Sequence, residues 1–137
     1  MSFLLDTNVI SETRKRIPHQ NVIAWLQQRD HKELYISVLT IGELAKGIAR
    51  RRKTDRQVAA SLEHWLLGIE ELFADRVIPI EPATARAWGE LNADQNLAVI
   101  DSFLAATAKV YDLTLVTRNV KDIETTGVRY FNPWDQA

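Results

Sequence analysis

Short runs of apolar and β-branched residues alternate along the chain with longer segments of helical period. Four runs are too short for helices and are predicted to be strands: residues 3–5, 34–37, 77–80 and 114–117. Five segments repeat apolar residues at three- and four-residue intervals and are predicted to be helices: residues 21–30, 41–52, 57–73, 83–92 and 99–111. This alternation predicts an α/β fold, with a central parallel sheet of four to five strands and helices on both faces. Residues 129–131 are expected to add the fifth strand.

Length and composition predict one domain that spans residues 1–137. The chain has 137 residues, of which 46% are hydrophobic, enough to bury one core. It has no cysteine and no apolar run long enough to cross a membrane, so we expect a cytoplasmic protein. The formal net charge of −1 excludes a strong overall positive field, and any contact with RNA must come from local patches. The basic runs at residues 14–16 and 50–53 are either solvated surface or a track for single-stranded RNA.

Three acidic residues are expected at one edge of the sheet. Asp6 directly follows the first strand, and Glu43 and Asp101 fall in the first turns of helices expected to begin near Thr40 and Val99. Ligands in open α/β sheets collect beyond the carboxyl ends of the strands, so the three side chains can converge. Three carboxylates would repel each other unless a cation joined them. Mg²⁺ suits such oxygen ligands, and Mn²⁺ would be tolerated.

Each of these acids also has a purely structural interpretation. An acid in the first turn of a helix is favoured by the helix dipole and by free backbone N–H groups. Residues 40–43, Thr-Ile-Gly-Glu, even have the form of a capping box. One acid alone therefore does not establish a metal site.

Taken together, these residues resemble the PIN-domain family, and specifically the VapC and FitB-like toxins of bacterial toxin–antitoxin pairs. The similarity covers nearly the whole chain and rests on five segments: residues 4–12, 36–44, 99–108, 115–119 and 131–134. It implies a PIN-like three-layer domain with Mg²⁺-dependent endoribonuclease activity, in which Asp6, Glu43 and Asp101 bind metal. It also implies inhibition by a cognate VapB-like, DNA-binding antitoxin, assembly into homodimers and toxin–antitoxin hetero-oligomers, and RNA substrates such as transfer RNA.

The fourth acidic position of the family is altered in this chain. Many members have Asp where this sequence has Asn119. Asp122 is one candidate to replace that acid, and the Asn119 amide, which can orient a water or a carboxylate, is the other. The sequence leaves open whether one or two metal ions bind.

Further positions are assigned to substrate and partner. Thr7, Asn8 and Thr117 are candidate hydrogen-bond donors around the acids, although Thr7 and Asn8 are equally suited to cap a first helix. Arg118 is expected to hold a substrate phosphate. Two amphipathic helices are expected to form a groove for an antitoxin segment or, alternatively, to fill the core or a homodimer contact: Ile23, Trp25, Leu26, Ile41, Leu44 and Ile48. Trp65 is expected in the core or an interface rather than as a stacking platform for bases.

Two other classes of function remain open. An aspartyl phosphotransfer enzyme or phosphatase would also place Asp after the first strand, but Asn8 stands where a second Asp would be needed. A catalytically weak PIN-like protein that only binds RNA is kept open by Asn119.

Overall fold

A five-stranded parallel sheet forms the centre of the protein. The computed structural model describes residues 1–135, and its strand order is β3-β2-β1-β4-β5 with every pair parallel. The strands are β1 (Phe3–Leu5), β2 (Leu34–Ser37), β3 (Val77–Ile78), β4 (Thr114–Val116) and β5 (Tyr130–Phe131). The predicted α/β class and the fifth strand are confirmed. Strand β3 is shorter than expected, because Pro79 has no N–H for the ladder.

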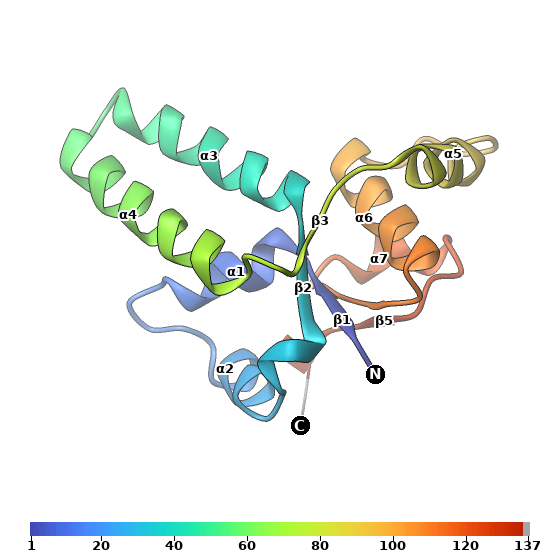
Figure 1. Ribbon diagram of the computed structural model, residues 1–137, viewed down its shortest axis with the longest axis horizontal. Coiled ribbons are helices and arrows are strands. Elements are labelled where there is room, and N and C mark those ends of the chain that lie inside the picture. Colours follow the sequence, from blue (N-terminus) through green and yellow to red (C-terminus); the bar gives the residue numbers. More distant parts are fainter. Residues whose placement is uncertain (136–137) are drawn as a thin grey trace.

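Helices cover both faces of this sheet and make three layers, as predicted. In Figure 1, the first four helices lie on one side of the strands and the last three on the other. The helices are α1 (Thr7–Thr13), α2 (Gln20–Gln27), α3 (Val38–Arg52), α4 (Arg56–Leu72), α5 (Pro82–Leu91), α6 (Val99–Val110) and α7 (Val120–Glu124). Two short 3₁₀ turns occupy His31–Glu33 and Pro133–Asp135. Among residues 1–135, no helix is both long and apolar enough to span a bilayer.

The central strand contributes to two separate hydrophobic cores. Phe3 and Leu5 face the layer of α1–α4, where Phe3 meets the edge of the Trp25 ring at a centroid distance of 5.0 Å. Leu4 faces the opposite layer and packs with Leu104 and other residues of α6. Because alternate side chains of a strand point to opposite faces, a strand buried on both sides is apolar throughout. Because β1 is buried on both faces, a polar side chain can be accommodated only beyond its carboxyl end.

The start of helix α3 corrects one expectation from the sequence. The helix begins at Val38, and Ser37 caps it by accepting the Leu39 N–H at 3.0 Å. Thr40 is therefore a buried residue inside the helix, and Glu43 lies in the second turn. The predicted capping box of Thr40 and Glu43 is wrong, because Ser37 already serves as the cap. The Glu43 carboxylate is thereby released from a capping role.

We expect opposite effects on stability from alanine at two glycines. Gly127, between α7 and β5, has a φ of +74° and no neighbouring atom that an added Cβ would meet, so Gly127→Ala should destabilise the fold by about 1 kcal/mol through backbone strain alone. Gly68 lies inside α4 with equally open surroundings, and Gly68→Ala should stabilise the fold by about 0.8 kcal/mol through helix propensity. Urea denaturation of the two variants measures both shifts. Shifts of the same sign would contradict the backbone conformation given for residue 127.

Candidate active site

Asp6 is fixed where the central strand turns into helix α1. Its backbone N–H extends the sheet by donating to the Val116 carbonyl at 2.9 Å. Its Oδ1 caps α1 by accepting the Thr7 N–H at 2.6 Å, and its Oδ2 accepts the Thr117 hydroxyl at 2.6 Å. The side chain is only 5% exposed. Asp6 is thus a helix cap and, at the same time, a carboxylate held rigidly at the edge of the sheet.

Glu43 reaches the same edge from α3 and is joined to Asp6 through a single residue. The Thr7 hydroxyl donates to Glu43 Oε1 at 2.5 Å, while the Thr7 N–H serves Asp6. The Thr7 hydroxyl also lies 3.0 Å from the hydroxyl of the buried Thr40 and can accept its proton. Thr7 therefore sets the relative position of two carboxylates that lie 37 residues apart in the sequence.

Asp101 approaches from the opposite layer, in the first turn of α6. The residues one and two turns onward, Ala105 and Ala108, are fully or almost fully buried, and their small side chains allow α6 to pack closely on the sheet. Ser102 secures the same turn: its hydroxyl accepts the Trp88 Nε1–H at 2.9 Å and donates to the Ala98 carbonyl at 2.8 Å. No side chain caps α6, so the acid in its first turn meets free N–H groups.

The carboxylates influence each other's ionisation. Burial raises the pKa of Asp6 from its ordinary value near 3.8 to about 6, against the lowering effect of the Thr117 hydroxyl, and the charges of Asp101 and Glu43 add to the rise. Burial also raises the pKa of Asp101, followed by the charges of Asp122 and Glu43. Acids from β1, α3 and α6 therefore lie within electrostatic reach of one another, as the sequence predicted.

The two candidates for the fourth acidic position, Asp122 and Asn119, lie in different surroundings. Asp122, in the first turn of α7, lies near enough for its charge to raise the pKa of Asp101. Asn119 is exposed, and its backbone N–H donates to the Thr117 hydroxyl at 3.0 Å. Asp122 therefore adds a fourth negative charge to the cluster.

The side chains of this cluster fit a hard divalent cation in their chemistry. They offer carboxylate oxygens, and the raised pKa values of Asp6 and Asp101 mark charge repulsion that a cation would relieve. Within residues 1–135, no three acidic or histidine side chains are positioned to bind one metal ion together. In the structure, the oxygens of Asp6 and Glu43 are turned to Thr7 and Thr117 instead.

The other predicted site residues take different places. Thr7 and Thr117 donate to the carboxylates, while Asn8 Oδ1 is buried without a hydrogen-bond partner among the described residues. Arg118 is exposed, with its guanidinium carbon 5.2 Å from the centre of the Trp134 ring. Thr7 and Thr117 are thus in contact with the acids, whereas Arg118 lies just outside, next to Thr117 in the chain.

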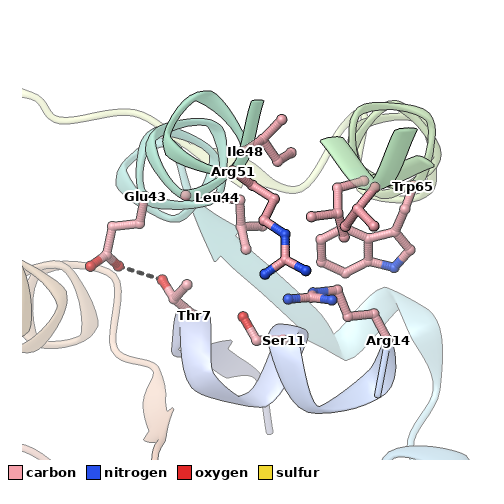
Figure 2. Close-up of a pocket in the computed structure, with 11 residues that line it drawn as sticks. Thr7, Ser11, Arg14, Glu43, Leu44, Ile48, Arg51 and Trp65 are labelled. Atoms are coloured by element: carbon pink, nitrogen blue, oxygen red, sulfur yellow. Dashed lines mark hydrogen bonds between the residues drawn. The ribbon is translucent and has the colours of Figure 1, made fainter. Parts of the chain in front are cut away.

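A cavity of about 450 Å³ opens beside Thr7 and Glu43, between α1, α3 and α4. Figure 2 shows the Arg14 and Arg51 guanidinium groups pointing into it, with the Trp65 ring on the α4 side. The Arg14 guanidinium carbon lies 6.0 Å from the centre of that ring. The rest of the wall is mainly apolar and includes Leu44, Ile48, Val58 and Leu62.

The residues predicted for the antitoxin groove take different places, and the core alternative holds for Trp25 on α2. Trp25 is 2% exposed and packs between Phe3 and Phe131, so it belongs to the core. Ile23 and Leu26 are half-buried and do not line the cavity. On α3, Leu44 and Ile48 do line it, while Ile41 packs against the core. The apolar face of α2 packs against the sheet. The accessible apolar wall is therefore formed by α3 and α4.

Sequence reasoning did not place Ser11, Val58, Leu62 and Trp65 next to the acids. Trp65 was expected in the core or an interface, and it is partly buried on the cavity wall. The basic runs were recognised as a possible RNA track, but the sequence could not tell which members point inward. Helical spacing gave the one available signal, since Glu43, Gly47 and Arg51 lie four residues apart on one face of α3.

Comparison with known proteins adds independent findings. Residues 3–126 match the family described as "PIN domain". The toxin FitB of Neisseria gonorrhoeae is 34% identical over 138 residues, covering 96% of this chain and 97% of FitB. The VapC ribonuclease Y4jK of Sinorhizobium fredii is 31% identical over 140 residues, covering 98% of this chain and 99% of Y4jK. The crystal structure of FitAcB from Neisseria gonorrhoeae superposes with a TM-score of 0.90 at 33% identity, covering 98% of this chain and 99% of that one.

We expect the metal-free protein to become less stable, relative to Asp6→Asn, as the pH rises. A carboxyl whose pKa is raised by folding stabilises the fold fully below its unfolded pKa, and that stabilisation is lost as the pH rises through the folded pKa. For Asp6 the window runs from near 3.8 to about 6. The free energy of unfolding of Asp6→Asn minus that of the wild type should therefore rise by about 2 kcal/mol between about pH 4.5 and about pH 7.5.

Urea denaturation in EDTA at several pH values measures this difference. Asp75→Asn is a suitable control, because the Asp75 side chain is 88% exposed and its ion pair with Arg76 is 3.5 Å long. Its difference from the wild type should be flat over the same range. A flat difference for Asp6→Asn as well would show that burial and repulsion do not perturb Asp6.

Proposed function

Since the chain belongs to the PIN-domain family, we propose that it is a divalent-metal-dependent endoribonuclease, the toxin of a toxin–antitoxin pair, acting in the cytoplasm as one domain. The observation that carries the proposal is the cluster of acids at the carboxyl ends of β1 and β2, where burial and mutual repulsion raise the pKa values of Asp6 and Asp101. The names of FitB and the VapC ribonuclease support the same activity.

In this proposal, Asp6 and Asp101 hold Mg²⁺, or Mn²⁺ in its place, and Glu43 completes the set. The bound ion would neutralise charge on the phosphodiester and lower the pKa of an attacking water. The Thr117 hydroxyl keeps Asp6 in its orientation, and the Thr7 hydroxyl does the same for Glu43. Glu43, whose carboxylate is half-buried beside Thr7, is placed to orient the water. No side-chain nucleophile is required.

Substrate and partner would approach the acids from two sides. Arg118 is exposed next to Thr117 and would hold a substrate phosphate. A cognate antitoxin would cover the cavity beside Glu43, with Leu44 and Ile48 on its accessible apolar wall. An antitoxin bound there would occupy the space next to the acids and exclude RNA. RNA cleavage would then be inhibited without any change in the fold.

Two alternatives lose support. The family match favours a nuclease over an aspartyl phosphatase, and both oxygens of Asp6 are engaged by hydrogen bonds rather than free to attack. The catalytically weak alternative rested on Asn119, and the charge of Asp122, which raises the pKa of Asp101, speaks for an active site instead.

Asp6→Asn and Asp101→Asn should each lower RNA cleavage with Mg²⁺ by roughly 100-fold or more, because each removes charge that binds the metal and stabilises the transition state. Cleavage of single-stranded RNA by the purified variants measures the loss, with circular dichroism to verify folding. Asp75 precedes the amino end of β3, away from the carboxyl ends of the strands where the acids lie. Asp75→Asn is therefore the matched control and should cleave at the wild-type rate. Wild-type cleavage by both site variants would overturn the metal assignment.

Asp122→Asn and Asn119→Ala decide which residue fills the fourth acidic position. If Asp122 contributes its charge to the site, Asp122→Asn should raise the Mg²⁺ concentration for half-maximal cleavage several-fold, while Asn119→Ala leaves it nearly unchanged. A Mg²⁺ titration of cleavage rates measures both. The reverse order of effects would assign the position to the Asn119 amide.

A further inference from the structure

The cavity between α1, α3 and α4 contains two arginines that have no anionic partner among the described residues. Arg14 and Arg51 both line it, and within residues 1–135 neither guanidinium group forms an ion pair or a hydrogen bond. Arg52, the next residue, pairs with Glu63 instead. Figure 2 shows both free guanidinium groups directed into the cavity. Two like charges that face one space favour an anion between them.

The aromatic wall of the cavity adds a second kind of recognition. The Trp65 ring is partly exposed there, and Arg14 stands over it with its guanidinium carbon 6.0 Å from the ring centre. An indole face beside guanidinium groups suits a nucleotide, since the base stacks on the ring and the phosphate pairs with arginine. Apolar residues alone would not select such a ligand, but this combination does.

The position of Arg14 is fixed by the end of helix α1. Glu12 is buried, accepts the His19 N–H at 2.9 Å and pairs with Lys15 at 2.9 Å. These contacts tie the segment after α1 back onto the helix, so the backbone that carries Arg14 is held in place. Arg51 is carried by the last turn of α3, which packs along α4. The backbone of each arginine therefore belongs to an ordered element, so binding need not order the main chain there.

We propose that this cavity is a nucleotide subsite of the enzyme: Arg14 and Arg51 hold the backbone phosphate of a nucleotide next to the scissile bond, and its base stacks on Trp65. The inference rests on the proposed ribonuclease function. The cavity shares Thr7 and Glu43 with the acidic site, so a single strand cleaved at the acids continues into it. The substrate is thus single-stranded RNA that extends beyond the cleaved bond on this side.

The test compares a charge-neutralised pair with a matched control pair. The variant Arg14→Met/Arg51→Met should bind a mixed-sequence octaribonucleotide roughly 10-fold more weakly in EDTA, and the slope of log affinity against log salt should fall by about 0.7 per lost phosphate contact. The control, Arg86→Met/Lys109→Met, changes the same net charge at exposed positions of α5 and α6 on the other face of the sheet. Its affinity and slope should stay near those of the wild type.

Trp65→Leu separates stacking from charge. It should weaken binding of the octaribonucleotide by roughly 10-fold while leaving the salt slope unchanged. Cleavage of a dinucleotide, which has no phosphate beyond the scissile one, should be insensitive to Arg14→Met/Arg51→Met, whereas cleavage of the octaribonucleotide should lose kcat/KM in that variant and in Trp65→Leu.

The outcomes distinguish the subsite from the proposed function. If the wild type cleaves the octaribonucleotide and the cavity pair binds and cleaves it like the control pair, the subsite is refuted and the ribonuclease stands. If the cavity variants lose only the binding of a protein partner, the cavity is a protein-binding surface and the inference is overturned. If the wild type cleaves no RNA with Mg²⁺, the proposed function fails and the subsite fails with it.

Discussion

The buried carboxylate of Asp6 is the constraint on which the rest of the structure depends. It ends the central strand, caps α1 and accepts the Thr117 hydroxyl from the end of β4, so it joins three elements at one point. Burying an ionised group costs free energy unless hydrogen bonds or opposite charges compensate it. Here two donors compensate the burial only in part, and burial together with the charges of Asp101 and Glu43 raises the pKa of Asp6. The hydrogen bonds of the fold therefore do not fully compensate the charge of the Asp6 carboxylate.

Each of the two helical layers around the sheet contributes different side chains to the site. The layer of α1–α4 supplies Glu43 and the arginine cavity, whereas the layer of α5–α7 supplies Asp101 and Asp122. Thr7 links the first layer to Asp6, and the small residues of α6 let the second layer close on it. In a parallel sheet the carboxyl ends of the strands lie at one edge. Acids from both layers can therefore reach that same edge.

The sequence was sufficient for the strands, for the five longer helices and for the acids, but not for α1, α7 and the cavity. Apolar runs identified all five strands, and the step from strand to acid identified Asp6. Helix α1 escaped the pattern because it is a single short helix that begins directly after a strand. Residues 40–43 misled the assignment of α3, because a local capping pattern can lie inside a helix that starts earlier. Trp25 and Trp65 have similar helical surroundings in sequence, and only packing against Phe3 or against Arg14 distinguishes a core residue from a cavity wall.

The order of the strands also has a consequence for synthesis on the ribosome. The first strand lies in the middle of the sheet, and its partner β4 begins at Thr114. More than a hundred residues must therefore leave the ribosome before β1 is paired on both sides, and Thr117 comes later still. A contact between strands so far apart in the sequence delays the completion of the sheet until β4 has been made. Under the proposed function, a nascent chain that ends before Thr117 cannot hold Asp6 in its final orientation, so the acidic site is completed only after β4 has been made.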